Sequence, residues 1–223
     1  DFGDLLFTGR YKTGASNQTR GVIFAGKDVV SPSAGKNNIN YITIASTGNA
    51  NDFGDLTATM IQPMPLQSPT RAVSVGGYNP SPGAYVTTSE FFNFSTLGNS
   101  AKFGDTGGNY YAGQGASNAT RGIVRIGAPA PNVGSLLTLQ MATLGELNDF
   151  GDSTFGFSHG DGNSSSTRAV FGGGYDSPNT PSKGSNIIEY VLINTLGNAT
   201  DFGDLTRQVF YAACVSNGHG GLG

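Results

Sequence analysis

Short apolar runs alternate with glycine-rich turns along the chain. In residues 149–200 the runs are "DFGDS" at 149–153, "FGFSH" at 155–159, "RAVFGGGY" at 168–175 and "NIIEYVLIN" at 186–194. Runs of this length, rich in Val, Ile, Phe and Tyr and bounded by Gly, Asn, Ser and Pro, are typical of β-strands. No sustained stripe has the i, i+3, i+4 spacing of an amphipathic helix. The pattern predicts four short strands in a small antiparallel sheet, which we name d, a, b and c in chain order.

The four-strand pattern is repeated along the chain. "DFGD" begins at Asp1, Asp52, Asp149 and Asp201, and "KFGD" begins at Lys102, which gives steps of 51, 50, 47 and 52 residues. "TR" pairs and "TGN" or "LGN" turns keep the same period. A period near 50 residues is typical of β-propellers of the kelch type. We therefore expect an all-β, kelch-like propeller in one domain, with repeats at 1–51, 52–101, 102–148, 149–200 and, in part, 201–223.

The strand count predicts how the ring closes. A kelch-type blade consists of a, b, c and the following d, so four complete blades leave the first d at 1–5 and the last a at 209–216. We expect these two ends to share a fifth blade, with about 25 residues before Asp1 supplying b and c, because closure removes exposed strand edges. The alternatives are a four-bladed ring, or a blade completed by another copy of the chain.

Composition argues against several classes of function. Charged residues make up 12% of the chain, the net charge is −3 and no basic stripe occurs, so nucleic acid is not an expected partner. No apolar run is long enough to span a membrane. One cysteine and two histidines supply neither a zinc nor a copper site, and no kinase or hydrolase motif set accompanies the repeated "DFG". We expect no enzyme activity, no catalytic residue, no metal and no cofactor.

The repeated motif residues are expected to have structural roles. The aspartates accept hydrogen bonds from turn amides in one interpretation, with the motif phenylalanines packed between blades. In a second interpretation each aspartate pairs with the arginine of a "TR" step, since the guanidinium fork matches a carboxylate. A calcium site is the functional alternative, but it needs six to eight oxygen ligands. The residues concerned are Asp4, Asp55, Asp105, Asp152 and Asp204, with Arg20, Arg71, Arg121 and Arg168.

The loops between b and c are the expected binding surface. They differ in sequence from repeat to repeat, occupy 27–38, 78–88, 128–135 and 175–185, and should emerge at one end of the propeller. Their Tyr, Asn, Ser and Gly content suits polar contacts with a sugar or a partner protein. The candidate binding residues are Tyr78, Asn79, Tyr85, Tyr175, Asp176 and Asn179.

Two resemblances add to these expectations. "RAVFGGGYDSP…SNIIEYVLIN" and "AVSVGGYNP" resemble kelch repeats, although "FAGKDV" and "RIGAPAP" lack the double glycine and the chain has no Trp. "TLGNATDFGDLT", "SNATRG" and "SNGHGGLG" are similar to repeats in virion proteins of marine phages, notably cyanophages, over nearly the whole chain.

The second resemblance implies a virion structural protein, a tail-fibre or decoration component for attachment or display. Its expected partners are other virion proteins and a host surface glycan or protein, and a homo-oligomer is compatible with it. The alternative function is that of a soluble carbohydrate- or protein-binding kelch-type propeller of a marine microbe.

Overall fold

All regular structure in the described part of the chain is β. The computed structural model describes residues 1–29, 34–129, 134–176 and 183–216, and these contain 21 strands and no helix. It follows that no helix within those ranges is long and apolar enough to cross a membrane.

Four antiparallel sheets, which we call sheets 1 to 4, each contain four main strands in the order a, b, c and d, and sheet 4 has a fifth, two-residue strand. Sheet 1 consists of β2 (Thr13–Ser16), β3 (Arg20–Phe24), β5 (Lys36–Thr43) and β6 (Asn51–Met60). Sheet 2 consists of β7 (Met64–Gln67), β8 (Arg71–Val75), β11 (Thr88–Asn93) and β12 (Ala101–Asp105). Sheet 3 consists of β13 (Gln114–Ser117), β14 (Arg121–Arg125), β15 (Ser135–Gln140) and β16 (Asn148–Asp152). Sheet 4 consists of β17 (Asp161–Ser164), β18 (Arg168–Gly172), β20 (Lys183–Leu192) and β21 (Thr200–Val209).

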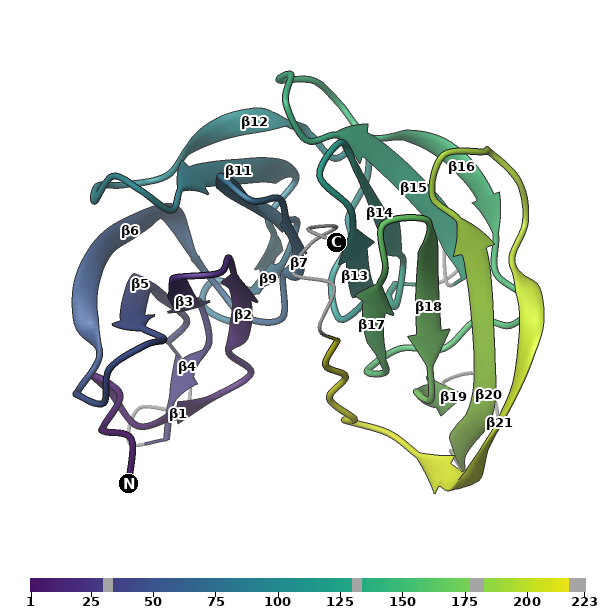
Figure 1. Cartoon of the computed structure of the whole chain (residues 1–223), viewed down its shortest axis with the longest axis horizontal. Helices are drawn as coiled ribbons and strands as arrows, with labels where there is room; N and C mark the ends of the chain where they lie inside the picture. Colours follow the sequence, from purple (N-terminus) through teal and green to yellow (C-terminus); the bar gives the residue numbers. More distant parts are fainter. Residues whose placement is uncertain (30–33, 130–133, 177–182, 217–223) are drawn as a thin grey trace.

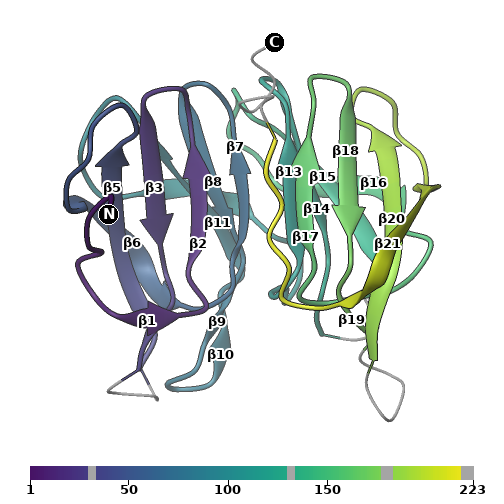
Figure 2. The ribbon, with the colours of Figure 1, turned by 60° about the horizontal axis from the view of Figure 1, so that its bottom comes forward.

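The sheets stand side by side around a common axis, with their a strands innermost and their d strands outermost (Figure 1). No sheet closes on itself, and the arc of sheets is open between sheet 4 and sheet 1 (Figure 1). The a-b-c-d pairing predicted from the sequence is confirmed in all four sheets. The remaining short strands lie at one end of the molecule (Figure 2): β1 (Gly9–Arg10) with β4 (Lys27–Asp28), β9 (Tyr78–Asn79) with β10 (Ala84–Tyr85), and β19 (Tyr175–Asp176) with β20.

The hydrophobic core is divided into three clusters, one between each pair of neighbouring sheets. Between sheets 1 and 2, the ring of Phe53 packs against that of Phe92 at 5.3 Å between centroids. Phe103 and Phe150 hold the corresponding places in the second and third clusters. Neighbouring sheets thus stabilise each other face to face, because one small sheet cannot bury both its faces alone.

The "DFGD" motif forms the joint between one sheet and the next through its main chain. The carbonyl of Phe53 accepts from Gly98 N–H at 2.8 Å and that of Asp55 accepts from Ser100 N–H at 2.9 Å. The Asp55 N–H donates to Asn99 Oδ1 at 3.0 Å, which explains why "LGN" shares the period of "DFGD". The same three bonds join Phe150 and Asp152 to Gly197, Asn198 and Ala199, and join Phe2 and Asp4 to Gly48, Asn49 and Ala50.

The motif glycine permits this close approach. At Gly54 the backbone has φ of +146°, and an added Cβ would lie 2.4 Å from the carbonyl oxygen of Gly98. At Gly104 an added Cβ would lie 1.9 Å from the oxygen of Gly145. Any larger residue would therefore push the two sheets apart.

The expected roles of the aspartate and arginine side chains need correction. The turn amides bond to the aspartate main chain and not to its carboxylate, and no ion pair among the described residues joins a motif Asp to a "TR" arginine. Instead three of the four arginines reach across to the next sheet. Arg71 donates to Met141 O at 3.0 Å, Arg121 donates to Ile193 O at 3.0 Å, and Arg20 donates to Phe94 O. The guanidinium groups of Arg20, Arg71 and Arg168 also cover an aromatic ring of their own sheet, and that of Arg71 lies 4.4 Å from the Phe91 ring centroid.

Candidate functional site

The innermost strands surround a central cavity of about 730 Å³. Strands β2, β7, β13 and β17 line it together with residues 211–216. Small residues dominate three of these strands, "TGAS" in β2, "QGAS" in β13 and "DGNS" in β17, and they leave space open at the axis. Concave sites of this size are where small ligands bind in proteins.

A ladder of main-chain hydrogen bonds runs around the cavity. Gln62 donates to Tyr11 O at 3.3 Å, Ala112 to Gln62 O at 3.0 Å, His159 to Ala112 O at 3.0 Å and Tyr211 to His159 O at 2.7 Å. All five residues have φ between 52° and 59°, although none is glycine. This repeated conformation turns each main-chain N–H toward the neighbouring sheet, and it includes the C-terminal segment.

The C-terminal segment lies beside β17 as β17 lies beside β13. Ser164 Oγ donates to Ser117 O at 2.6 Å, and Ser216 Oγ donates to Ser164 O at 2.9 Å. The N–H of Cys214 donates to the Asp161 carboxylate. Residues 211–216 therefore occupy the innermost place that follows β17 in the arc.

Burial shifts the pKa values of three groups that line the cavity, each in the direction that favours the neutral form. Burial raises the pKa of Asp161, against the opposing effect of the amides of Cys214 and Gly162, and burial lowers the pKa of His159. Burial, helped by Asp161, also raises the pKa of the Cys214 thiol, which therefore has little thiolate character. Within the described ranges, no three His, Cys, Asp or Glu side chains are grouped to hold a metal ion. The described lining of the cavity thus offers main-chain amides together with hydroxyl, carboxamide and carboxyl side chains as hydrogen-bonding groups.

Three tyrosines come together at the end that carries the b–c loops. The ring centroids of Tyr78, Tyr85 and Tyr111 lie 5.4–5.8 Å apart in all three pairs. Each ring is half-buried, and no hydrogen bond of the described residues involves their hydroxyls. Burial, followed by the two neighbouring phenols, raises the pKa of Tyr111, so its hydroxyl keeps its proton. We call this group the tyrosine triad.

The sequence predicted two members of the triad, and the structure assigns the other candidates differently. Asn79 shapes its loop, because its Oδ1 accepts from Ser81 N–H at 3.1 Å. Tyr175 belongs to a separate cluster, with His159 at 6.3 Å and Phe210 at 5.9 Å. The Asp176 side chain and Asn179 lie outside what the structure describes. Tyr111 was missed because it precedes an a strand and only the fold brings it to the b–c loop.

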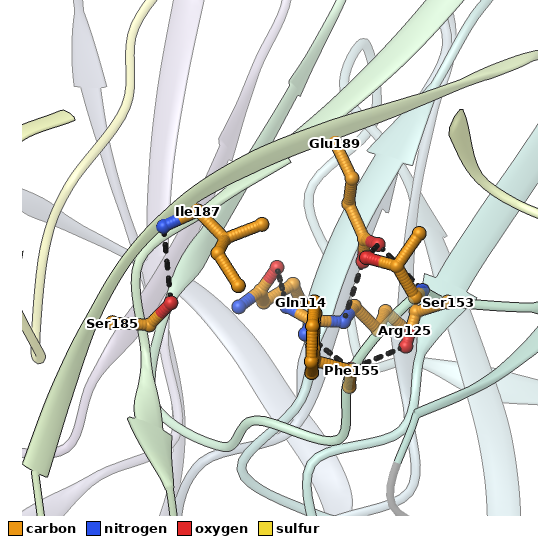
Figure 3. Close-up of polar contacts among 8 residues, drawn as sticks. Gln114, Arg125, Ser153, Phe155, Ser185, Ile187 and Glu189 are labelled. Atoms are coloured by element: carbon orange, nitrogen blue, oxygen red, sulfur yellow. Dashed lines mark hydrogen bonds and ion pairs between the residues drawn. The ribbon is translucent and has the colours of Figure 1, made fainter. Parts of the chain in front are cut away.

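A buried ion pair joins sheets 3 and 4 (Figure 3). Arg125 Nε lies 3.1 Å from Glu189 Oε1, and both side chains are almost fully buried. Arg125 also donates to Gln114 Oε1 and to Phe155 O, at 3.2 and 2.8 Å. Burial lowers the pKa of Arg125 and the Glu189 carboxylate opposes that shift.

The Glu189 carboxylate is also held by the preceding sheet. It accepts from the N–H and the hydroxyl of Thr154 at 2.7 and 2.6 Å. The sequence signal for this pair is one charged residue within each of the apolar runs "GIVRIG" and "NIIEYVLIN".

These features place the molecule in a structural class: it is an all-β, propeller-like protein with antiparallel sheets of four main strands around a central cavity. The solved structure "Structure of YjhT" is similar to it, with a TM-score of 0.72 and 12% identity over 91% of this chain and 73% of that chain. At this identity the likeness bears on the fold alone. Comparison with protein-family models and with curated proteins gives no match.

Proposed function

We propose that this protein is an attachment module, which binds a neutral glycan at the tyrosine triad and catalyses no reaction. The triad carries the proposal: Tyr78, Tyr85 and Tyr111 gather three rings and three free hydroxyls at one accessible place. A sugar ring has an apolar face that packs on an aromatic ring, and hydroxyls that exchange hydrogen bonds with phenols. A surface without a strong charge suits a neutral ligand.

The role within a virion is the wider proposal, and the "TLGNATDFGDLT" resemblance supports it. In this role the propeller is part of a tail-fibre or decoration protein, outside the cell, with other virion proteins as its partners. Mass spectrometry of purified particles against the soluble lysate tests it. Enrichment in the particles supports the proposal, and recovery only from the lysate favours the soluble carbohydrate-binding propeller.

Glycan binding is tested by an array screen followed by titration calorimetry on the selected glycan. Tyr111→Ala should weaken binding at least about tenfold, which corresponds to about 1.4 kcal/mol. Tyr111→Phe keeps the ring and removes the hydroxyl, so it separates stacking from hydrogen bonding. Tyr190→Phe, in β20 of sheet 4 beneath Arg168, is the matched control and should leave binding unchanged. Equal affinity in all three variants would contradict the site.

We also propose that the four sheets belong to a five-membered ring. Residues 211–216 continue the innermost ladder after β17, and residues 1–4 make the outer joint that each d strand makes with the next sheet. The two ends of the chain thus take the first and last places of a fifth sheet between sheets 4 and 1. The opening in Figure 1 is where its middle strands belong.

A further inference from the structure

The faces on both sides of the opening are apolar but uncovered. Phe202, in the motif copy of sheet 4, is 55% exposed, whereas its counterparts Phe53 and Phe150 are 3% and 2% exposed. Phe2, in the first copy, is 41% exposed. On the sheet 1 side, Ile44 stands at the place of the buried Phe94 and is itself exposed. An exposed apolar surface of this kind marks a docking site.

Polar groups at the opening also lack the partners that their counterparts have. Arg168 covers the Tyr190 ring, but it makes no bond to a carbonyl of a following sheet, as Arg71 and Arg121 do. On the other side, the carbonyl of Ile44 receives no arginine, although that of Ile193 does. At the opening, the Arg168 guanidinium thus lacks a carbonyl acceptor from a following sheet, and the Ile44 carbonyl lacks an arginine donor from a preceding sheet.

A third orphan group lies in sheet 1. Asn40 is buried, and its Oδ1 has no hydrogen-bond partner. At the same position in sheet 2, Glu90 accepts from the N–H of Thr57 in the preceding sheet at 2.8 Å. Leu6 stands where Thr57 stands in the motif, but it is not in a strand and does not reach Asn40. A buried unpaired oxygen is costly, which favours any change that pairs it.

We propose that the opening binds a two-stranded β-hairpin of the repeat's own b–c type, and that this hairpin runs directly into Asp1. The inference rests on the five-membered ring proposed above and names what completes it. The hairpin would pair with 211–216 on one edge and with 1–6 on the other. Its first strand would supply an arginine to Ile44 O, and the end of its second strand would supply a carbonyl to Arg168.

Direct continuity with Asp1 follows from the strand order. In all four sheets the c strand leads into the d strand through a short turn, and residues 1–4 already make the contacts of a d strand. The segment that leads into residues 1–4 would therefore be the neighbouring c strand of the same sheet. With a c strand to pair with, residues 1–6 would become extended, and the Leu6 N–H would come within reach of Asn40 Oδ1.

The test fuses a copy of residues 70–101, the b–c segment of sheet 2 with its turn, before Asp1 of the full chain. Amide hydrogen exchange is then compared between the unmodified chain, the fused chain and a fusion with the same residues in scrambled order. We expect exchange in residues 1–6 and 211–216 to slow at least about tenfold in the fused chain only. Phe202→Ala should lower the urea midpoint more in the fused chain than in the unmodified one.

Several results would overturn the proposal. One is a fused chain that folds without slower exchange at the two ends. Another is an unmodified chain of doubled mass whose ends are already protected, since a second copy would then fill the opening. If the fusion does not fold, the 70–101 peptide is added to the unmodified chain. Saturable protection of the same two segments supports the site, and its absence at millimolar peptide refutes it.

The same exchange data separate this proposal from those on which it rests. If the amides of Gly48 and Ala50 exchange freely in the unmodified chain, then residues 1–4 do not hold a d place and the five-membered ring itself is wrong. If these amides are protected and the hairpin has no effect, only the occupant is wrong. Glycan affinity, measured by titration of the unmodified chain, tests the tyrosine triad independently of the ring and the hairpin.

Discussion

Replacing the motif phenylalanine at two positions, Phe150→Ala and Phe202→Ala, should give very different losses of stability. A phenylalanine side chain offers about 200 Å² for burial, at about 25 cal/mol per Å². Phe150 is 2% exposed, so its truncation should cost about 5 kcal/mol. Phe202 is 55% exposed, so the same change should cost about 2 kcal/mol. The expected difference is about 3 kcal/mol, and it is more secure than either value because errors of the unfolded-state reference cancel.

Urea unfolding followed by far-ultraviolet circular dichroism measures this difference directly. The two variants share the substitution, the motif and the strand type, so each is the control for the other. Losses that agree within about 1 kcal/mol would refute the reasoning, because sheet 4 would then be covered as completely as sheet 3. A larger loss at Phe202 than at Phe150 would contradict the arrangement of the sheets themselves.

Three further predictions concern the joints and the cavity. Glu189→Ala leaves Arg125 buried without its partner and should cost about 3–5 kcal/mol in urea unfolding, whereas exchanging both residues for Met should restore most of that stability. Gly104→Ala should cost about 1–3 kcal/mol through its clash with the Gly145 carbonyl, whereas Gly145→Ala, with nothing within 4 Å of an added Cβ, should cost less. Burial lowers the pKa of His159 in the folded state. The stability that neutral His159 contributes is therefore present above about pH 6.5 and is lost as the pH falls through the lower folded pKa. His159→Gln should flatten the decline of the melting temperature below about pH 6.5.

The strand order was accessible from the sequence because it depends on local chemistry. Apolar runs of strand length, glycine turns and a fixed period are properties of short windows, and all four sheets follow them. The turn between a and b is equally local. In "SNQTR" the Asn17 side chain accepts from the N–H groups of Thr19 and Arg20, and Asn118 does the same in "SNATR".

The roles of the motif residues were less accessible, because they depend on a neighbouring sheet. One of the two interpretations paired the motif aspartates with the "TR" arginines through their charges. In the structure Asp55 bonds through its main chain, and Arg71 donates to a carbonyl of the following sheet. A shared period shows that two positions belong to one repeat, but not whether they contact each other or the next copy. For the same reason Arg125 and Glu189 could be seen as isolated charges, but not as a pair.

Comparison among the repeats separates the positions that build the fold from those that are free to bind. Joint positions keep their residue types, as the glycine of each "FGD" does at Gly54, Gly104 and Gly151, because the neighbouring sheet constrains them. The place of Tyr111 is different: the other repeats have Arg10, Ile61, Ser158 and Phe210 there, and all are compatible with the same backbone ladder. The place of Tyr78 likewise accepts Lys27, Ala128 or Tyr175. A fold that accepts so many residue types at these two positions does not require tyrosine at either. The meeting of Tyr78, Tyr85 and Tyr111 at one accessible point therefore supports the proposed glycan site, because the fold alone does not account for it.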